Sequence, residues 1–241
     1  MPRSGPLVLC YHAVSDGWQH TLSTSPAMLA RQLAMLMRWY RPMTVDEVLG
    51  GDRRGLHVTF DDAYRSIERA LPVLRRLGVP ATVFACSGYA EEGRALDVPE
   101  LAAEAAAHPV ELATMRWDEL RALAEDGIEI GSHTVTHAHL TSLDASQLER
   151  ELTESRQRIE DELERPCRYL AYPYGEENER VRAAARTAGY AAAFALFGDL
   201  GQVDPFAIPR LGLWRDDHLL RTVAKVAFVY GKNRTPKKQP T

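Results

Sequence analysis

Two adjacent carboxylates, Asp61 and Asp62, follow the apolar run Val58-Thr59-Phe60. Packing does not account for two acidic side chains at the end of an apolar strand, so the pair predicts a bound cation or a proton transfer. Neighbouring residues of an extended segment point to opposite sides, which would let one carboxylate bind a metal ion while the other acts as a base. The alternative is a helix N-cap, which accounts for one carboxylate but not readily for both.

His133 and His137 follow another short β-like run, Ile128-Glu129-Ile130. Two imidazoles four residues apart share one face of a helical turn, a spacing that suits a single first-row metal ion. With Asp62 they would form a site of two histidines and one carboxylate, with positions left open for water and substrate. The alternative is a pair of hydrogen-bonded loop histidines, a description that fits His139 better.

Short β-like runs alternate with helix-length amphipathic segments along the chain. The predicted strands are Leu7–Tyr11, His57–Phe60, Ala81–Cys86, Ile128–Gly131, Tyr169–Ala171, Ala191–Ala195 and Ile208–Leu213. The predicted helices cover residues 26–39, a short segment opened by Thr44, and residues 64–77, 115–125, 145–164, 177–188 and 219–230. This alternation predicts an α/β fold with a parallel sheet inside a layer of helices, and about seven units fit a closed or nearly closed barrel.

Chemistry in such barrels lies at the C-terminal ends of the strands, where both Asp61-Asp62 and His133 fall. Residues 87–113 interrupt the alternation with an Ala- and Glu-rich stretch. This stretch predicts a small helix on a long loop, placed as a wall or lid beside those strand ends.

The 241 residues carry a net charge of −4, which gives no electrostatic signature of a nucleic-acid binder. We expect one domain over residues 1–230 and a basic, disordered tail over residues 231–241, with contact between this tail and an anionic membrane as a weaker alternative. Cys10, Cys86 and Cys167 are widely spaced and predict buried free thiols in a reducing compartment. The N-terminal apolar stretch is too short for a signal peptide, and no segment approaches the roughly 20 apolar residues of a membrane helix, so we expect a cytoplasmic location.

Three motifs in chain order carry a resemblance to a known family: Thr59-Phe60-Asp61-Asp62, Ser132-His133-Thr134-Val135-Thr136-His137 and Tyr172-Pro173-Tyr174-Gly175. Together with Leu9-Cys10-Tyr11-His12 and Gly78-Val79-Pro80-Ala81-Thr82-Val83-Phe84, they resemble the successive motifs of the polysaccharide deacetylase family, the NodB-homology carbohydrate esterases of family 4. The resemblance extends from about Leu7 to Leu213. It implies a distorted (β/α)7 barrel and the metal-dependent removal of an acetyl group from a sugar.

The resemblance also implies a role for individual residues. Asp62, His133 and His137 would hold the metal ion, which is usually zinc in this family, and Asp61 would be the general base. The metal ion would lower the pKa of its bound water towards about 7 and polarise the acetyl carbonyl, while Asp61 removes the proton of the water. The backbone N–H of Tyr174 would donate to the tetrahedral oxyanion.

This sequence departs from the family pattern at three points. Ala63 stands where the family usually has a glycine after the paired aspartates. Ala171 stands where an arginine orients the base in other members, and Arg210 is the obvious substitute because we expect it near a strand end. The late histidine that normally supplies the general acid is missing, since His218 is expected at a helix start.

His12 offers a replacement for the missing acid, because it ends the first predicted strand and so faces the same end of the barrel as Asp61. A permuted motif order, as in exopolysaccharide deacetylases that carry this Tyr-His at the front, would make His12 the acid that protonates the leaving amine. A histidine that is merely buried is the structural alternative.

The sequence therefore predicts a hydrolase that uses Zn²⁺ or another divalent first-row metal ion to remove an acetyl group from a sugar or glycoconjugate, with N-acetyl preferred to O-acetyl. One alternative is an amidohydrolase of the same superfamily that acts on a small cyclic amide or formamide. Another is a non-catalytic carbohydrate-binding protein, suggested by Ala63, Ala171 and the missing late histidine. Retention of Asp61 and of all three candidate metal ligands argues against this last reading.

Overall fold

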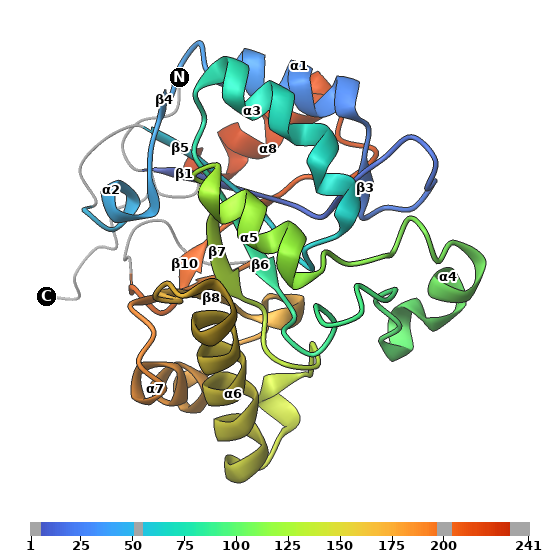
Figure 1. The fold of residues 1–241 in the computed structure, drawn as a ribbon. Coiled ribbons are helices and arrows are strands. Elements are labelled where there is room, and N and C mark those ends of the chain that lie inside the picture. The colour runs from blue at the N-terminus through green and yellow to red at the C-terminus, as the bar shows by residue number, and fades with distance from the viewer. Residues whose placement is uncertain (1–5, 51–54, 197–203, 232–241) are drawn as a thin grey trace, which may run out of the picture.

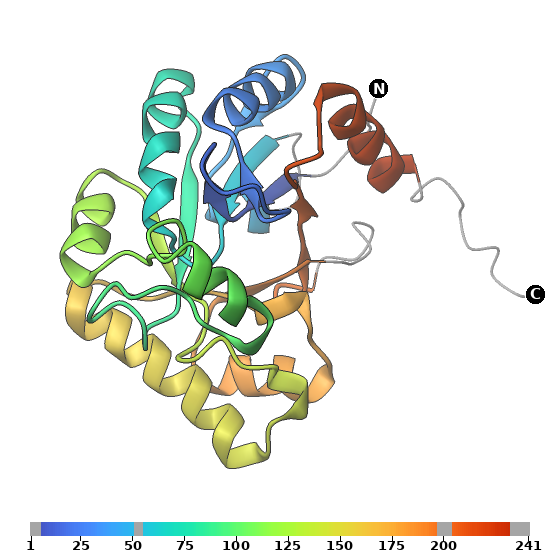
Figure 2. The same ribbon diagram turned by 90° about the vertical axis from the view of Figure 1, so that its right-hand side faces the viewer.

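Parallel strands form a nearly closed barrel surrounded by helices in the computed structural model, which describes residues 6–50, 55–196 and 204–231 (Figure 1, Figure 2). The sheet contains β1 (Leu7–Tyr11), β4 (Arg41–Pro42), β5 (Gly55–Phe60), β6 (Ala81–Ala85), β7 (Glu129–Ser132), β8 (Tyr169–Ala171), β9 (Ala192–Ala195), β10 (Ile208–Pro209) and β11 (Leu211–Gly212). A separate pair is formed by β2 (Ala13–Val14) and β3 (Ser23–Thr24). The barrel predicted from the sequence is confirmed. The predicted tail lies, from residue 232 onward, outside the described residues.

The barrel closes through a single short segment of chain. The strand order is β10-β9-β8-β7-β6-β5-β1-β11, so β10 and β11 lie at opposite edges of the sheet. Ile208 and Pro209 pair with β9, whereas Leu211 and Gly212 pair with β1. The sequence predicts one continuous strand over residues 208–213. This was wrong, because the two halves of the segment pair with different strands. The segment changes partner at Arg210, because it bridges the gap between the two edges.

Helices cover the outside of the barrel (Figure 2). The α-helices are α1 (Pro26–Leu36), α2 (Val45–Leu49), α3 (Leu71–Leu77), α4 (Ala102–Ala107), α5 (Trp117–Glu125), α6 (Ala145–Leu163), α7 (Glu179–Thr187) and α8 (Leu219–Gly231). The 3₁₀ helices are η1 (Arg65–Ala70), η2 (Pro99–Leu101), η3 (Leu140–Ser142) and η4 (Pro173–Gly175). Within the described ranges, none of these helices combines the length and the apolar character that crossing a bilayer requires.

Side-chain caps are present at the start of three helices. The hydroxyl of Ser25 accepts from the N–H of Met28 at the start of α1, and Thr44 and Asp144 form capping boxes at α2 and α6. The helix predicted over residues 64–77 begins instead as 3₁₀ helix η1. Pro72 has no N–H to donate to the preceding turn, so an uninterrupted α-helix cannot run through it.

Successive side chains of each strand point in opposite directions, one into the barrel interior and the next into the layer beneath the helices. Inside the barrel the rings of Phe84 and Phe194 lie 5.4 Å apart, and Val8 packs in the same cluster. Leu9 and Val58, one residue out of phase, belong to the larger core beneath the helices.

The side chains of β5 that point into the barrel are polar. The ring of His57 is buried there, with Nδ1 at 2.8 Å from the carbonyl oxygen of Met43 and Nε2 at 2.9 Å from the hydroxyl of Thr82. These partners satisfy both nitrogens, which makes His57 a structural residue. The same phase of the strand continues through Thr59 to Asp61, so the fold itself turns Asp61 towards the barrel interior.

Gly131 of β7 provides a test of this packing. A Cβ at this position would lie 2.5 Å from Cε1 of Phe84 and 2.9 Å from the carbonyl oxygen of Tyr169. We therefore expect Gly131→Ala to lower the free energy of unfolding by about 1–3 kcal/mol, as overpacked cores do. Urea denaturation measures the change.

Gly50→Ala is the matched control, because a Cβ there would meet no atom closer than 3.5 Å. It should change the free energy of unfolding by less than about 1 kcal/mol. Equal effects of the two substitutions would contradict the packing described for β7.

Candidate active site

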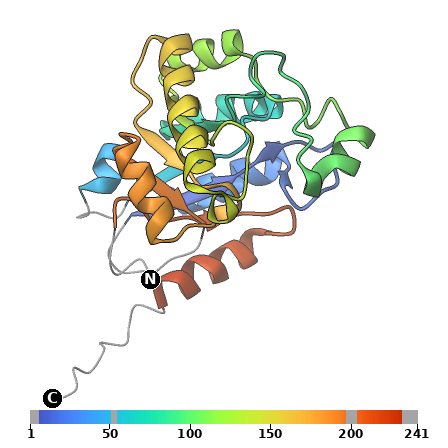
Figure 3. The same cartoon turned by 90° about the horizontal axis from the view of Figure 1, so that it is seen from below.

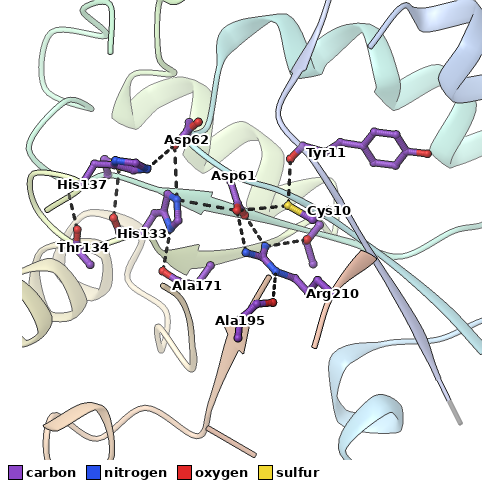
Figure 4. Close-up of polar contacts among 12 residues, drawn as sticks. Cys10, Tyr11, Asp61, Asp62, His133, Thr134, His137, Ala171, Ala195 and Arg210 are labelled. Carbon is purple, nitrogen blue, oxygen red and sulfur yellow. Dashed lines mark hydrogen bonds and ion pairs between the residues drawn. The ribbon is translucent and has the colours of Figure 1, made fainter. Parts of the chain in front are cut away.

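Asp61 and Asp62 lie at the C-terminal end of β5 (Figure 4). The backbone N–H of Asp61 donates to the carbonyl of Tyr11 at 2.9 Å, which completes the pairing of β5 with β1. The chain then turns, because Asp62 and Ala63 adopt left-handed backbone angles with φ of 69° and 49°. The prediction of an extended backbone through both aspartates was therefore wrong. This turn directs Asp62 towards the histidines, while Asp61 faces Arg210 (Figure 4).

Left-handed backbone is concentrated in the loops at this end of the barrel. Of the six non-glycine residues with positive φ in the described chain, five are Asp62, Ala63, Thr134, His137 and Tyr174. Each costs roughly 1–2 kcal/mol, and such strain is typical of functional sites whose surroundings fix the backbone. The angle at Ala63 explains why a glycine suits this position. Burial of its methyl group offsets about 0.8 kcal/mol of that cost, so alanine is tolerated.

Asp62, His133 and His137 converge on one point. Oδ1 of Asp62 lies 3.5 Å from Nε2 of His133 and 3.4 Å from Nε2 of His137. One ligand atom from each residue lies within 4.8 Å of the other two, and all three side chains are buried. The structure thus brings together the three residues that the sequence predicts as metal ligands.

The hydrogen bonds of His133 determine which of its nitrogens carries the proton. Nδ1 of His133 lies 2.8 Å from the carbonyl oxygen of Ala171, and a carbonyl can only accept, so Nδ1 is the donor. In the neutral imidazole, Nε2 then presents a lone pair towards Asp62. Oδ1 of Asp62 is buried and has no hydrogen-bond partner among the described residues. Lone pairs that converge without a proton between them fit a cation.

Burial disfavours the charged form of each of the three groups. It raises the pKa of Asp62, against the lowering effect of the nearby His12 and His133. It lowers the pKa of His133 and lowers that of His137 to about 4. Two neutral imidazoles therefore face a carboxylate whose charge is poorly compensated. This donor set fits a divalent metal ion of the zinc type.

The segment between the two histidines is a loop rather than the helical turn that the sequence predicts. Thr134 and His137 have φ of 70° and 61°, angles that no α-helix contains. Glu151 of α6 holds the loop instead, since its carboxylate accepts from the N–H groups of Val135 and Thr136 at 2.8 and 2.9 Å. The sequence reasoning missed Glu151. Its signal was a charged residue on the buried stripe of α6.

Asp61 forms a bidentate ion pair with Arg210 (Figure 4). The two guanidinium nitrogens lie 2.5 and 2.8 Å from the two carboxylate oxygens, and both side chains are buried. Arg210 also donates to the hydroxyl of Thr59 at 3.0 Å and to the carbonyl of Ala195 at 3.3 Å. Arg210 thus contacts the carboxylate that the sequence reasoning expected it to orient.

The ion pair fixes the charge state of Asp61. Burial by itself would raise the pKa of Asp61, but the charge of Arg210, with further contributions from His133 and His12, holds it well below its usual range. Asp61 likewise holds the pKa of Arg210 above its usual range, against the effect of burial. Asp61 is therefore ionised throughout the neutral range.

Cys10 and His12 lie on the other side of Asp61. The thiol of Cys10 donates to Oδ2 of Asp61 at 3.4 Å, and burial raises the pKa of Cys10, so the donor keeps its proton. The predicted buried, free thiols are confirmed, but this contact was not foreseen. Burial lowers the pKa of His12, although Asp62 and Asp61 oppose this effect. The ring of His12 lies 5.3 Å from that of Trp214.

Cys10, His12 and Asp61 also place three potential ligand atoms within 4.8 Å of one another. Arg210 already compensates the charge of Asp61 in this second group. It is consequently a poorer cation site than Asp62, His133 and His137.

Tyr174 connects the histidine loop to residues 87–113. Its ring packs against His137 with centroids 4.6 Å apart and stacks on His139 at 3.7 Å. Its hydroxyl donates to Glu100 of η2 at 2.8 Å, and His139 lies between Glu100 and Glu176. The predicted wall at this end of the barrel thus contacts the residue whose N–H is expected to bind the oxyanion. His218 is exposed just before α8, as expected for a helix start.

The chain is similar to known proteins in sequence and in fold. The family described as polysaccharide deacetylase matches residues 50–193, more than half of the chain. The chain belongs to the polysaccharide deacetylase family. It is 26% identical to YxkH of Bacillus subtilis, a protein with the provisional name polysaccharide deacetylase. The 196 aligned residues cover 76% of this chain and 61% of YxkH.

The chitooligosaccharide deacetylase of Rhizobium leguminosarum bv. trifolii is 28% identical to this chain over 142 residues, or 58% of this chain and 55% of the relative. The chain thus spans less than two thirds of the length of both curated relatives. The structure of IcaB from Ammonifex degensii matches with a TM-score of 0.74 and 22% identity, covering 93% of this chain and 98% of that one. This last match shows a shared fold.

The buried ion pair between Asp61 and Arg210 predicts that an Arg210→Met variant is less stable than the wild type. Removal of one partner from a buried pair leaves an uncompensated charge, so we expect the free energy of unfolding at neutral pH to fall by about 3–5 kcal/mol. Chemical denaturation with a metal chelator present measures this loss. Arg168→Met, which breaks an exposed pair with Asp46, should cost less than about 1 kcal/mol.

The difference between wild type and Arg210→Met should depend on pH. Because the folded-state pKa of Asp61 lies below its unfolded value of 3.8, the pair stabilises the wild type above that value and loses its effect as the pH falls through the folded-state pKa. In the variant, burial raises the pKa of Asp61, so acidification relieves the penalty. The two curves should converge at low pH, and a difference that did not depend on pH would contradict the assignment.

The convergence of Asp62 with the histidines predicts metal binding. His133→Ala and His137→Ala should each weaken zinc binding roughly 100-fold or more. Loss of a residue that only orients a metal ligand weakens binding less, by about 10- to 100-fold. Metal content after equilibrium dialysis is the measurement. His139→Ala is the matched control and should keep its metal, because its ring contacts Tyr174, Glu100 and Glu176 instead. Full metal content in His133→Ala would exclude His133 as a ligand.

Proposed function

We propose that the protein is a metal-dependent hydrolase that removes an N-acetyl group from a sugar or glycoconjugate. The observation that supports this most directly is the placement of two buried aspartates in opposite electrostatic surroundings. Asp61 is compensated by Arg210, whereas Asp62 faces two imidazole nitrogens and has no lysine or arginine beside it among the described residues. Such a division is typical of sites in which neighbouring carboxylates perform different tasks.

In this proposal Asp62, His133 and His137 hold the metal ion, with Zn²⁺ the best match to the donor set. When bound, a divalent ion there polarises the acetyl carbonyl and makes the attacking water more acidic. The carbonyl of Ala171 keeps the proton of His133 on Nδ1, so that Nε2 stays available as a ligand. Glu151 fixes the loop that carries both histidines.

Asp61 is the proposed general base. Its Oδ2 is 4.0 Å from Nε2 of His133, which places this oxygen beside the proposed metal ligands. Arg210 and Cys10 keep the carboxylate ionised and oriented, so it is ready to accept the proton of the water. The backbone N–H of Tyr174 is the proposed donor to the oxyanion, on a residue whose left-handed φ of 60° fixes the direction of its peptide group.

His12 is the proposed general acid: its imidazolium form, which burial disfavours but the charges of Asp62 and Asp61 favour by raising its pKa, would give a proton to the leaving amine. It lies within 4.8 Å of Asp61 and Cys10, and its Nδ1 is a buried atom without a hydrogen-bond partner in the described residues. An N-acetylated sugar as substrate is supported by the family and by the name of the Rhizobium relative, a chitooligosaccharide deacetylase. A purely carbohydrate-binding role is disfavoured, because such a role does not require the buried Asp61–Arg210 pair.

Acetate release from N-acetylated oligosaccharides by the zinc-loaded protein tests the proposed function. The same samples are assayed for formate, ammonia and acetate from O-acetylated sugars, which separates the deacetylase from an amidohydrolase or esterase. We expect release of free amine and acetate in equal amounts. Absence of turnover on all of these substrates by fully metal-loaded protein would falsify the proposal.

Two variants separate catalysis from metal binding. Asp61→Asn and His12→Asn should retain zinc but lower kcat roughly 100-fold or more, the scale of a general base or acid. Thr141→Ala removes a hydroxyl that contacts Glu176 on a half-buried residue; it is the control and should keep the kcat of the wild type. Loss of zinc together with activity would show that the two residues act through the metal site instead.

A further inference from the structure

Helix α8 lies at the outside of the barrel (Figure 3), and several of its apolar side chains are exposed. Leu220 is 79% exposed and Phe228 is 62% exposed, while Val223, Ala224 and Ala227 are exposed between them. Residues 220, 223, 224 and 227 follow the spacing of one helix face. A continuous row of exposed apolar side chains on a helix marks an interaction surface more often than a solvated one.

The inner face of α8 shows why this row remains outside. Thr222 and Val226 are buried, and the hydroxyl of Thr222 accepts from the side-chain amide of Gln32 in α1 at 3.1 Å. Lys225 bends back to donate to Asp217 and to the carbonyl of Gly212. These hydrogen bonds hold the helix to α1 and β11 through this inner side. Its apolar row lies on the opposite side.

Basic side chains are concentrated in α8 and in the sequence that follows it. All four lysines of the protein, Lys225, Lys232, Lys237 and Lys238, lie in α8 or in the sequence that follows it. Residues 219–241 contain six basic and no acidic side chains, whereas residues 1–218 contain 23 basic and 33 acidic ones. A strongly basic segment on an acidic protein selects an anionic partner.

We propose that α8 binds the surface of an anionic lipid bilayer, lying in the interface with its apolar row inserted among the lipids. Helices of this kind combine an apolar face with flanking basic side chains, and their binding increases with both. Leu220 and Val223 supply the apolar contact, and the basic residues that follow α8 in the sequence supply attraction to the headgroups. The proposal does not depend on the proposed catalytic function.

Vesicle co-sedimentation of the full chain tests this surface. The wild type should bind vesicles of phosphatidylcholine with phosphatidylglycerol, bind vesicles of phosphatidylcholine alone at least tenfold more weakly, and dissociate at high salt. Leu220→Gln with Val223→Gln should weaken binding roughly 10- to 100-fold through lost apolar contact. Substitution of Lys232, Arg234, Lys237 and Lys238 by Gln should weaken it roughly 100-fold through lost attraction.

Val110→Gln is the matched control, because Val110 is 81% exposed but lies between α4 and α5. It should bind vesicles as the wild type does, and circular dichroism confirms that each variant is folded. Equal binding of the wild type to neutral and anionic vesicles, or no binding to either, would overturn the proposal. So would a wild-type dimer in solution that Leu220→Gln with Val223→Gln converts to a monomer without any vesicle binding, since a second copy would then cover the row.

Discussion

The ion pair between Asp61 and Arg210 joins the closure of the barrel to its chemistry. Arg210 stands between β10 and β11, where one segment of chain connects the two edges of the sheet. Desolvation of both charges costs several kcal/mol per ion, which only good geometry can offset. The bidentate contact, Thr59, Cys10 and the carbonyl of Ala195 together provide that geometry. A change at Arg210 would therefore affect the last strands and the proposed base together.

The same pair explains how two adjacent aspartates come to differ. Arg210 lowers the pKa of Asp61, while burial raises that of Asp62. The left-handed turn at Asp62 makes this division possible, since it carries the second carboxylate away from the arginine and towards the histidines. Backbone strain, an internal cation and a pair of oriented imidazoles are thus parts of one arrangement.

Much of this arrangement follows from the sequence, because periodicity and motif order report strands and their ends. The positions of most strands, the short helix that Thr44 opens, and the meeting of Asp62 with the two histidines agree with the predictions. The local backbone angles of the site loops could not be predicted from the sequence. The turn at Asp62 and the loop after His133 depend on contacts from distant elements, such as Glu151 of α6, which no local pattern contains. The change of partner at Arg210 likewise depends on how the whole sheet closes.

The confinement of every lysine to residues 225–238 has a practical consequence. Reagents that couple to primary amines will modify this protein only through its amino terminus and its C-terminal region. None of the side chains proposed for the metal ion or for catalysis carries such an amine, since the buried cation beside Asp61 is an arginine. Coupling through side-chain amines would therefore leave the two aspartates and the two histidines chemically unchanged.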